Sequence, residues 1–272
     1  MSASYVAAGL SFDFQFFIHA LFHPSASFVQ GLWRTIYISV TAQTFGIILG
    51  LGIALMRHSK KPWLNSFAGA YIWFIRGTPL LVQLVLVYDG LASIGLYSFP
   101  DLYILGINFP GVIQAGLITL AVNESAYMAE IIRAGIDSVA KGQLEAALAV
   151  GMTQRSAMRW IVLPQAVRII MPPLGNDFNA LMKTTSLLSV IGVQEVFLNA
   201  QEVSSTTFRT LEIFLVAALY YLILTTVWSV IQGLIETRLD AGSGIVRAPS
   251  IAQRLFGGSR ATMSTAGGGI GE

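Results

Sequence analysis

The sequence predicts an all-α, polytopic membrane protein with five transmembrane helices. Its 272 residues are 54% hydrophobic and only 11% charged, and their mean hydropathy is +0.68. A soluble domain of this length does not need so apolar a composition, whereas a chain that crosses a bilayer repeatedly does. Five apolar stretches are long enough to cross as helices, and basic residues gather in alternate loops between them.

The N-terminal segment, residues 1–30, contains no Lys or Arg and is rich in Phe. We predict that Phe12 to Leu21 forms an amphipathic helix, because apolar and small polar residues alternate along it. This stretch is too short to span a bilayer, so we expect it to lie on the outer face of the membrane.

The transmembrane domain, residues 31–240, begins with a predicted helix from about Trp33 to Met56. Three glycines in this helix mark a face at which another helix can approach closely: Gly46, Gly50 and Gly52. A basic cluster follows directly, which indicates the inner membrane surface.

The second predicted helix runs from about Leu64 to Tyr88 and is interrupted at residues 76–79, which read Arg-Gly-Thr-Pro. An irregular outer loop is expected over residues 89–110, because Gly and Pro punctuate it and it contains no basic residue.

Three further spans complete the domain. We place them at about residues 112–132, 169–193 and 211–235, joined by an inner loop at 138–164 and an outer loop at 194–209. Residues 241–272 are rich in small and polar residues with little apolar surface to bury, so we expect a disordered cytoplasmic tail.

The distribution of basic residues predicts the orientation. Of the 16 Lys and Arg residues, only Arg209 falls in a segment placed outside. Those placed inside are Arg57, Lys60, Lys61, Arg133, Lys141, Arg155, Arg159, Arg168, Arg238, Arg247, Arg254 and Arg260. Because positive residues concentrate in cytoplasmic loops, the N-terminus is expected outside and the C-terminus inside.

The inner loop at 138–164 contains the least apolar long segment between the first and last spans, Glu145 to Pro164. Good helix formers open it, Gly151 is placed to end a first short helix in a left-handed conformation, and Thr153 can cap a second. We expect the second helix to stop near Pro164, which lacks a backbone N–H. Two short helices at an angle would present a docking surface to another protein, with Arg155 and Arg159 able to reach acidic groups.

The spacing within this loop resembles the EAA motif of ABC importer permeases. It carries Glu145, Ala146, Ala147 and Gly151, and it ends at Leu163 and Pro164. In that family the loop seats in a cleft of the ATPase subunit and couples ATP hydrolysis to the membrane subunit. The resemblance therefore implies a type I ABC importer permease fold in which these residues and Arg155 form the coupling loop.

The fourth span is the most polar of the five. Asn176, Asn179 and Lys183 fall on one helical stripe, with Asp177 beside it. Polar groups at membrane depth are costly unless they face protein, water or a partner. We interpret the stripe as lining a translocation path, and the alternative is that these groups hydrogen-bond neighbouring helices.

The third span carries Asn123 and Glu124 at a depth similar to that of Arg76 in the second span. Equal depth and opposite charge predict a structural ion pair between Arg76 and Glu124. We also place Asn123 and Glu124 among the path residues.

Four further segments extend the resemblance to the polar amino acid uptake branch of these permeases, which includes histidine, glutamine, arginine and opine systems. They are RGTPLLVQL from Arg76, NESAYMAEIIRAGI from Asn123, LPQAVRIIMPPLGN from Leu163 and KTTSLLSVIG from Lys183. The resemblance covers about residues 28–240. One departure is Ala140, where many members have Pro.

The resemblance implies a working unit of several chains in a bacterial inner membrane. It contains two permease subunits, identical or paired with a sister chain, an ABC ATPase dimer and a periplasmic amino acid binding protein. The permease subunits also contact membrane lipid. The chain has no GxxxxGK[ST] motif, so ATP and Mg²⁺ are expected on the partner ATPase and no cofactor in this chain. Zero Cys excludes cysteine-ligated metal sites, and neither a metal nor a nucleic acid partner is expected.

Two other classes of function are open. A secondary transporter or channel acting without an ATPase would need an internal repeat or its own coupling-ion sites, and five spans with one inner loop argue against both. A membrane anchor without a transport role would have no need of the polar fourth span. The sequence does not fix which amino acid or opine is carried.

Overall fold

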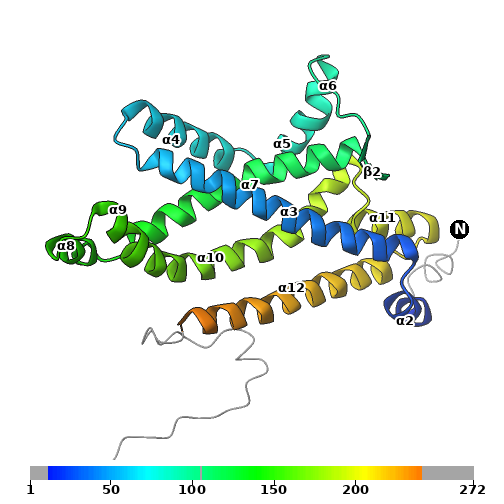
Figure 1. The fold of residues 1–272 in the computed structure, drawn as a ribbon. Helices are drawn as coiled ribbons and strands as arrows, with labels where there is room; N and C mark the ends of the chain where they lie inside the picture. The colour runs from blue at the N-terminus through cyan, green and yellow to red at the C-terminus, as the bar shows by residue number, and fades with distance from the viewer. Residues whose placement is uncertain (1–11, 105, 241–272) are drawn as a thin grey trace, which may run out of the picture.

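The computed structural model describes residues 12–104 and 106–240, and these form a bundle of long helices (Figure 1). Helices α3 (Ala26–Arg57), α7 (Gly111–Asp137), α10 (Leu163–Thr184) and α12 (Thr210–Asp240) run along the bundle. Helices α8 (Lys141–Ala149) and α9 (Gln154–Ala157) lie at one end, and α2 (Phe14–Phe22) and α11 (Val196–Thr207) lie at the other.

The predicted count of five spans is not confirmed. Within the described residues, α3 and α12 are long and apolar enough to cross a membrane, and two bent helix pairs raise the number to at most four. Helix α7 is not among them, yet it lies in the middle of the bundle with Leu120, Ser125 and Ala126 fully buried. Because protein rather than lipid surrounds α7, it does not need an apolar surface all round.

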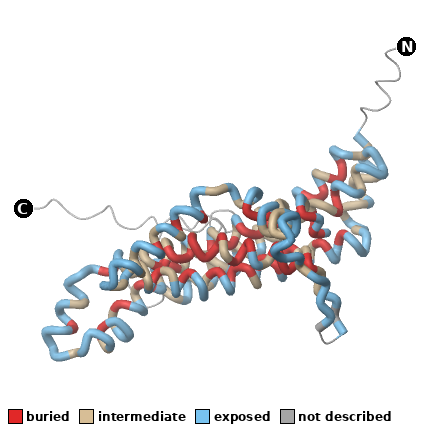
Figure 2. Tube along the Cα trace, turned by 90° about the horizontal axis from the view of Figure 1, so that it is seen from above, coloured by how far each residue is buried: buried red, intermediate tan, exposed pale blue. Residues whose placement is uncertain are grey.

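The bundle core follows the contact of α7 with α3 and α10, and buried residues run along the middle of the molecule in Figure 2. The predicted glycine face of α3 is confirmed at two positions. A Cβ atom on Gly46 would lie 2.6 Å from Glu124 Cβ, and one on Gly50 would lie 2.6 Å from Met128 Cβ, so only glycine permits this approach. Gly52 faces open space and takes no part in it.

The second predicted span is a sharply bent pair and not one straight crossing. Helix α4 (Pro62–Gly77) is followed by α5 (Leu80–Val85), η1 (Leu86–Gly90) and α6 (Leu91–Ser93), and the two halves meet at 101°. Thr78 is extended, with φ −114° and ψ 142°, because a residue that precedes proline avoids the helical region. The interruption seen in the sequence is thus a corner.

Both loops that the sequence places outside contain regular structure that the sequence did not predict. Strands β1 (Leu102–Ile104) and β2 (Ile107–Phe109) form an antiparallel hairpin in which Leu102 pairs with Phe109. The loop at 194–209 is mostly helix α11, which meets the preceding helix at 52°. Buried Glu195 caps α11 by accepting hydrogen bonds from the backbone N–H groups of Phe197 and Leu198, each at 2.8 Å.

The prediction that a helix stops near Pro164 is wrong. Helix α9 continues through the π-helical turn η2 (Met158–Val162), α10 and the 3₁₀ segment η3 (Thr185–Ile191), so residues 154–191 form one helix. The N–H of Leu163 bonds to Met158 O, and this wider turn places Pro164 in the first turn of α10. Proline is tolerated there because its missing N–H needs no helical partner.

The helix predicted for Phe12 to Leu21 is present as α2, which packs against α12; its position on the outer face of the membrane stays a prediction. Tyr220 Oη donates a 2.8 Å hydrogen bond to Leu21 O, and the N–H of Asp13 donates to Glu212 Oε1 at 2.7 Å. Asp13 also pairs with Arg209, which connects the start of α2 to the start of α12. The tail predicted for residues 241–272 lies outside the described residues, as do residues 1–11.

Candidate coupling loop and translocation path

The end of the bundle formed by α8 and α9 is built as the sequence predicts. Gly151 has φ +86°, a left-handed conformation that strains other residues. Its N–H bonds to Leu148 O at 3.0 Å, and the N–H of Met152 bonds to Ala147 O at 3.1 Å, which together form a Schellman motif that ends α8. Thr153 caps α9 by accepting from the N–H of Ser156 at 3.2 Å.

This knuckle, residues 141–164, has one face anchored and one face free. Ala147 and Ala157 are buried against the bundle. Most of the predicted coupling residues are exposed: Glu145, Ala146, Gly151, Arg155, Leu163 and Pro164. An open depression runs along Gln154, Arg155, Met158, Arg159 and Leu163. A second protein can therefore contact the knuckle without unfolding it, and the two arginines favour acidic groups on that protein.

The end of α7, which leads into the knuckle, is joined by a side-chain contact to the end of α3. His58 Nε2 lies 3.0 Å from Asp137 Oδ1, and His58 Nδ1 lies 3.1 Å from Ala54 O. Both ring nitrogens face acceptors, so the ring donates to both only when it is protonated. The hydrogen bond from His58, with the charge of Arg133 adding to it, holds the pKa of Asp137 below its usual value of 3.8.

The polar residues of the third span have partners other than those predicted. Asn123 is buried and its Nδ2 donates a 3.0 Å hydrogen bond to Gln83 Oε1 on α5. Glu124 is also buried, and its side chain interacts with Asp177 on α10. Within the described part of the chain, Glu124 Oε2 and Asp177 Oδ2 are buried without a hydrogen-bond donor.

The predicted ion pair between Arg76 and Glu124 is not formed. Arg76 is exposed, and its guanidinium lies 5.0 Å from the centre of the Tyr127 ring. Their predicted helix faces were wrong, since position along a helix says nothing about rotation around it. By contrast, Arg133 and Glu130 form a 3.0 Å ion pair one turn apart on α7.

The stripe on the fourth span divides into two parts. Asn179 donates from Nδ2 to Ser229 Oγ at 3.1 Å and to Thr225 O at 3.4 Å, which joins α10 to α12. Asn176 and Lys183 are exposed on α10. In the isolated subunit Asn179 thus serves helix packing, whereas Asn176 and Lys183 are available to face a path.

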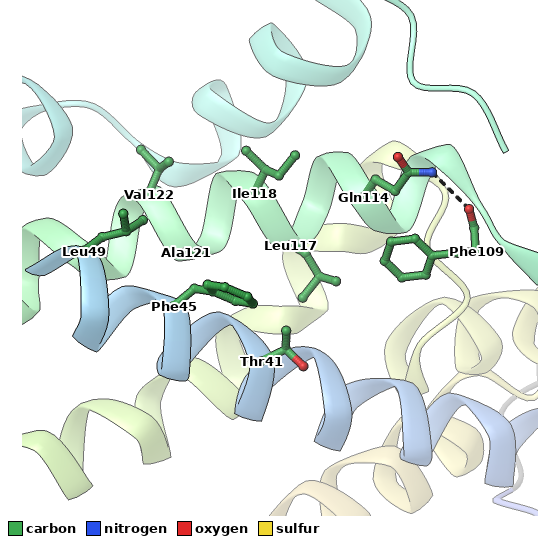
Figure 3. Close-up of a pocket in the computed structure, with 9 residues that line it drawn as sticks. All are labelled: Thr41, Phe45, Leu49, Phe109, Gln114, Leu117, Ile118, Ala121 and Val122. Atoms are coloured by element: carbon green, nitrogen blue, oxygen red, sulfur yellow. Dashed lines mark hydrogen bonds between the residues drawn. The ribbon is translucent and has the colours of Figure 1, made fainter. Parts of the chain in front are cut away.

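A groove elsewhere on the bundle does not contain any of these residues. It lies between α3 and α7, has a volume of about 430 Å³, and is lined mainly by apolar side chains such as Phe45, Leu49 and Leu117 (Figure 3). The side-chain amide of Gln114, at one end of the groove, already has a partner, because its Nε2 donates to Phe109 O at 3.0 Å. The groove therefore offers apolar surface and not a polar passage.

Sequence reasoning missed Gln83, which turns out to connect the corner of the second span to Asn123. The available signal was a single amide side chain in an otherwise apolar run, four residues after Pro79. A buried amide must find hydrogen-bond partners, and the carbonyl freed by the proline was the nearest candidate.

Comparisons with known proteins identify relatives over most of the chain. Residues 46–241 match the family model described as "Binding-protein-dependent transport system inner membrane component". The probable amino-acid permease protein YxeN of Bacillus subtilis (strain 168) is 39% identical over 228 residues, which cover 84% of this chain and 96% of the relative. The probable glutamine ABC transporter permease protein GlnM of the same organism is 38% identical over 223 residues, covering 82% and 98%.

A solved structure supports the same relationship. The chain is 40% identical to a chain in the crystal structure of an amino acid ABC transporter with histidines, with a TM-score of 0.73. The match covers 84% of this chain and 100% of that chain.

Proposed function

Because this chain belongs to the family of binding-protein-dependent transport system inner membrane components, we propose that it is the membrane-spanning permease subunit of an ATP-driven importer of a polar amino acid or related opine. The main support for the proposal is the structure of the knuckle. Its exposed face and the left-handed turn at Gly151 present a surface to which a separate ATPase can bind. The chain itself supplies the membrane path and no catalysis.

The partners follow from that role. An ABC ATPase dimer, which holds ATP and Mg²⁺, contacts the knuckles of two permease subunits, identical or paired with a sister chain. A binding protein delivers the amino acid on the outer side of the bacterial inner membrane. The knuckle end is cytoplasmic in this proposal, so α2 lies outside and α12 ends inside, in agreement with their positions at opposite ends of the bundle in Figure 1.

The continuous helix from Gln154 to Ile191 connects the knuckle to the path. It carries Arg155 at the ATPase contact and Asn176, Asp177 and Lys183 further along. Because the helix is continuous, a displacement at its knuckle end can be passed along it toward the path residues. We propose that movement of the ATPase subunits shifts this helix and switches the path between outward and inward openings.

The path draws on polar groups from two helices, namely Asn123 and Glu124 on α7 and Asn176, Asp177, Asn179 and Lys183 on α10. An amino acid must exchange its hydration for fixed donors and acceptors while it crosses, and this set supplies both. Exposed Asn176 and Lys183 are the side chains that a neighbouring permease subunit would meet across the path.

Reconstitution of the subunit with its ATPase and binding protein into proteoliposomes tests the function. We expect uptake of a labelled polar amino acid that requires ATP hydrolysis and continues when ionophores collapse the ion gradients. Uptake that survives replacement of ATP by a non-hydrolysable analogue, but stops with the ionophores, would instead identify a secondary transporter.

A further inference from the structure

The apolar groove between α3 and α7 has no part in the proposed function. Thr41, Phe45 and Leu49 form its α3 side, and because they are spaced four residues apart they lie in one row along the helix. The facing row on α7 runs from Gln114 to Val122 (Figure 3). Each row extends over about 12 Å of helix rise. The groove is therefore elongated, and its shape suits an extended apolar chain.

The lining by itself does not select an occupant. Phe45 and Leu49 are 53% and 46% exposed. The amide of Gln114 is already bonded to Pro100 O and Phe109 O. Inside a bilayer, lipid tails are as apolar as these side chains, so no hydrophobic effect holds a ligand in the groove. A bound molecule therefore needs a polar contact at one end of the groove.

A cation lies on the same face of α3, beyond the Thr41 end of the groove. Arg34 lies seven residues before Thr41 and eleven before Phe45, so the three side chains share one helix face. Arg34 is partly exposed, and its Nη1 donates to Gln194 O at 2.8 Å and lies 3.5 Å from Gln194 Oε1. No carboxylate among the described residues pairs with it. A guanidinium has five N–H donors, so several remain available to an anion.

Two aromatic side chains indicate that Arg34 lies at the level of the membrane interface. Trp33 is 65% exposed and Tyr37 is 37% exposed, and they flank Arg34 on α3. Trp and Tyr concentrate where the hydrocarbon meets the headgroups. The groove begins at Thr41, about 6 Å of helix rise beyond Tyr37. Because one leaflet contributes about 15 Å of hydrocarbon, a molecule with an anionic group at Arg34 and a chain along the groove matches a leaflet in length.

We infer that this face binds a phospholipid, with the phosphate at Arg34 and one acyl chain in the groove between α3 and α7. Guanidinium N–H groups form strong, charge-assisted hydrogen bonds to phosphate oxygens. The acyl chain needs no hydrogen bonds, and the apolar lining requires none from it. In the orientation proposed above, the lipid belongs to the outer leaflet. The inference adds a lipid site to the proposed function and does not depend on which substrate is carried.

Native mass spectrometry of the assembled permease–ATPase complex in detergent tests the inference. The probes are dioleoyl-phosphatidylglycerol and dioleoylglycerol, which carries the same chains but no phosphate. The wild-type complex should bind phosphatidylglycerol with a lower Kd than dioleoylglycerol. In Arg34→Gln, the Kd for phosphatidylglycerol should rise about tenfold, because a charge-assisted hydrogen bond to the phosphate is lost. The Kd for dioleoylglycerol should stay unchanged.

Arg209→Gln is the matched control. Arg209 is also a partly exposed arginine at this end of the bundle, but it pairs with Asp13 and lies over the ring of Phe16. Its replacement should leave both Kd values at the wild-type level. Equal rises in the two arginine variants would overturn the inference, because they would reflect general charge attraction and not a site.

Thr41→Trp tests the groove independently of Arg34. The indole ring occupies the space between the two rows, so the Kd values for both probes should rise together. Ile48→Trp is its control, because Ile48 is 60% exposed on the same helix and does not line the groove. If Arg34→Gln does not assemble, this pair decides the matter, and equal Kd values in the two tryptophan variants would overturn the inference.

Two further results would contradict the inference and leave the proposed function intact. One is a wild-type complex that binds the two probes equally or not at all. The other is a photoactivated cross-linker on Phe45→Cys that couples to the second permease subunit instead of to lipid, which would show that protein covers the groove. Conversely, a complex that binds phosphatidylglycerol as expected but imports no amino acid would contradict the proposed function alone.

Discussion

At the scale of single residues, Asp137 links stability to pH. Its pKa is lower in the folded protein than in an unfolded chain, because His58 and Arg133 favour the charged form. A group of this kind stabilises the fold above its unfolded pKa of about 4, and the contribution is lost as the pH falls through the lower folded value.

We therefore expect wild-type protein to be more heat-stable than Asp137→Asn at neutral pH, and the difference to shrink on acidification below about pH 4. Thermal unfolding of the detergent-extracted complex between pH 3 and 8 checks this. A constant gap between the two proteins across the whole series would show that the carboxylate charge has no part in stability.

Glu195 is a second residue with a defined local role. Its side chain is fully buried and accepts from two backbone N–H groups of α11 and from Tyr221 Oη at 2.6 Å. Glu195→Ala leaves these donors unpaired, so the free energy of unfolding should fall by about 3 kcal/mol or more. Glu202→Ala, a change at an exposed glutamate of the same helix, is the control and should have little effect on thermal stability. Equal losses would mean that the cap is not responsible.

At the scale of elements, the turn at Gly151 decides the shape of the knuckle. A Cβ there meets no neighbour, but a φ of +86° strains any L-residue by about 1–2 kcal/mol. Gly151→Ala should therefore distort the angle between α8 and α9 and reduce both co-purification of the ATPase and substrate-stimulated ATP hydrolysis.

Gly142→Ala provides the comparison within α8. Gly142 also meets no neighbour within 4 Å, but it has an ordinary helical backbone, so alanine fits without strain. This variant should couple like wild type. If Gly151→Ala also retains the ATPase and the stimulated hydrolysis, the left-handed turn has no role in coupling.

At the scale of the whole molecule, the path can be mapped with single cysteines, since the chain contains none. A water-soluble thiol reagent should label Asn176→Cys and Lys183→Cys in the assembled transporter. It should not label Phe178→Cys or Leu181→Cys, whose side chains are 7% and 1% exposed. Lipid-facing positions would also be exposed in the isolated subunit, but they would resist the charged reagent. Protection at 176 and 183 would therefore remove this face of α10 from the path.

The sequence by itself determined the features that depend on composition and on local backbone rules. Apolar length, the placement of basic residues and the coupling motif predicted the class of protein. Steric preferences predicted the left-handed turn at Gly151, the cap at Thr153 and the close approach at Gly46 and Gly50. Each of these depends on a residue and its immediate neighbours, so it can be read without knowing the fold.

The tertiary structure alone decided which side chains meet. Successive residues on a helix point about 100° apart, so a small rotation of α4 or α7 changes every partner across the interface. The sequence placed Arg76 and Glu124 at equal depth, yet Glu124 meets Asp177, and Gln83 joins the corner to Asn123. The same holds for Pro164, because a wide turn supplied by the preceding residues lets the helix continue through it. Contacts between distant segments depend on the rotation and angle of whole helices, which local preferences do not specify.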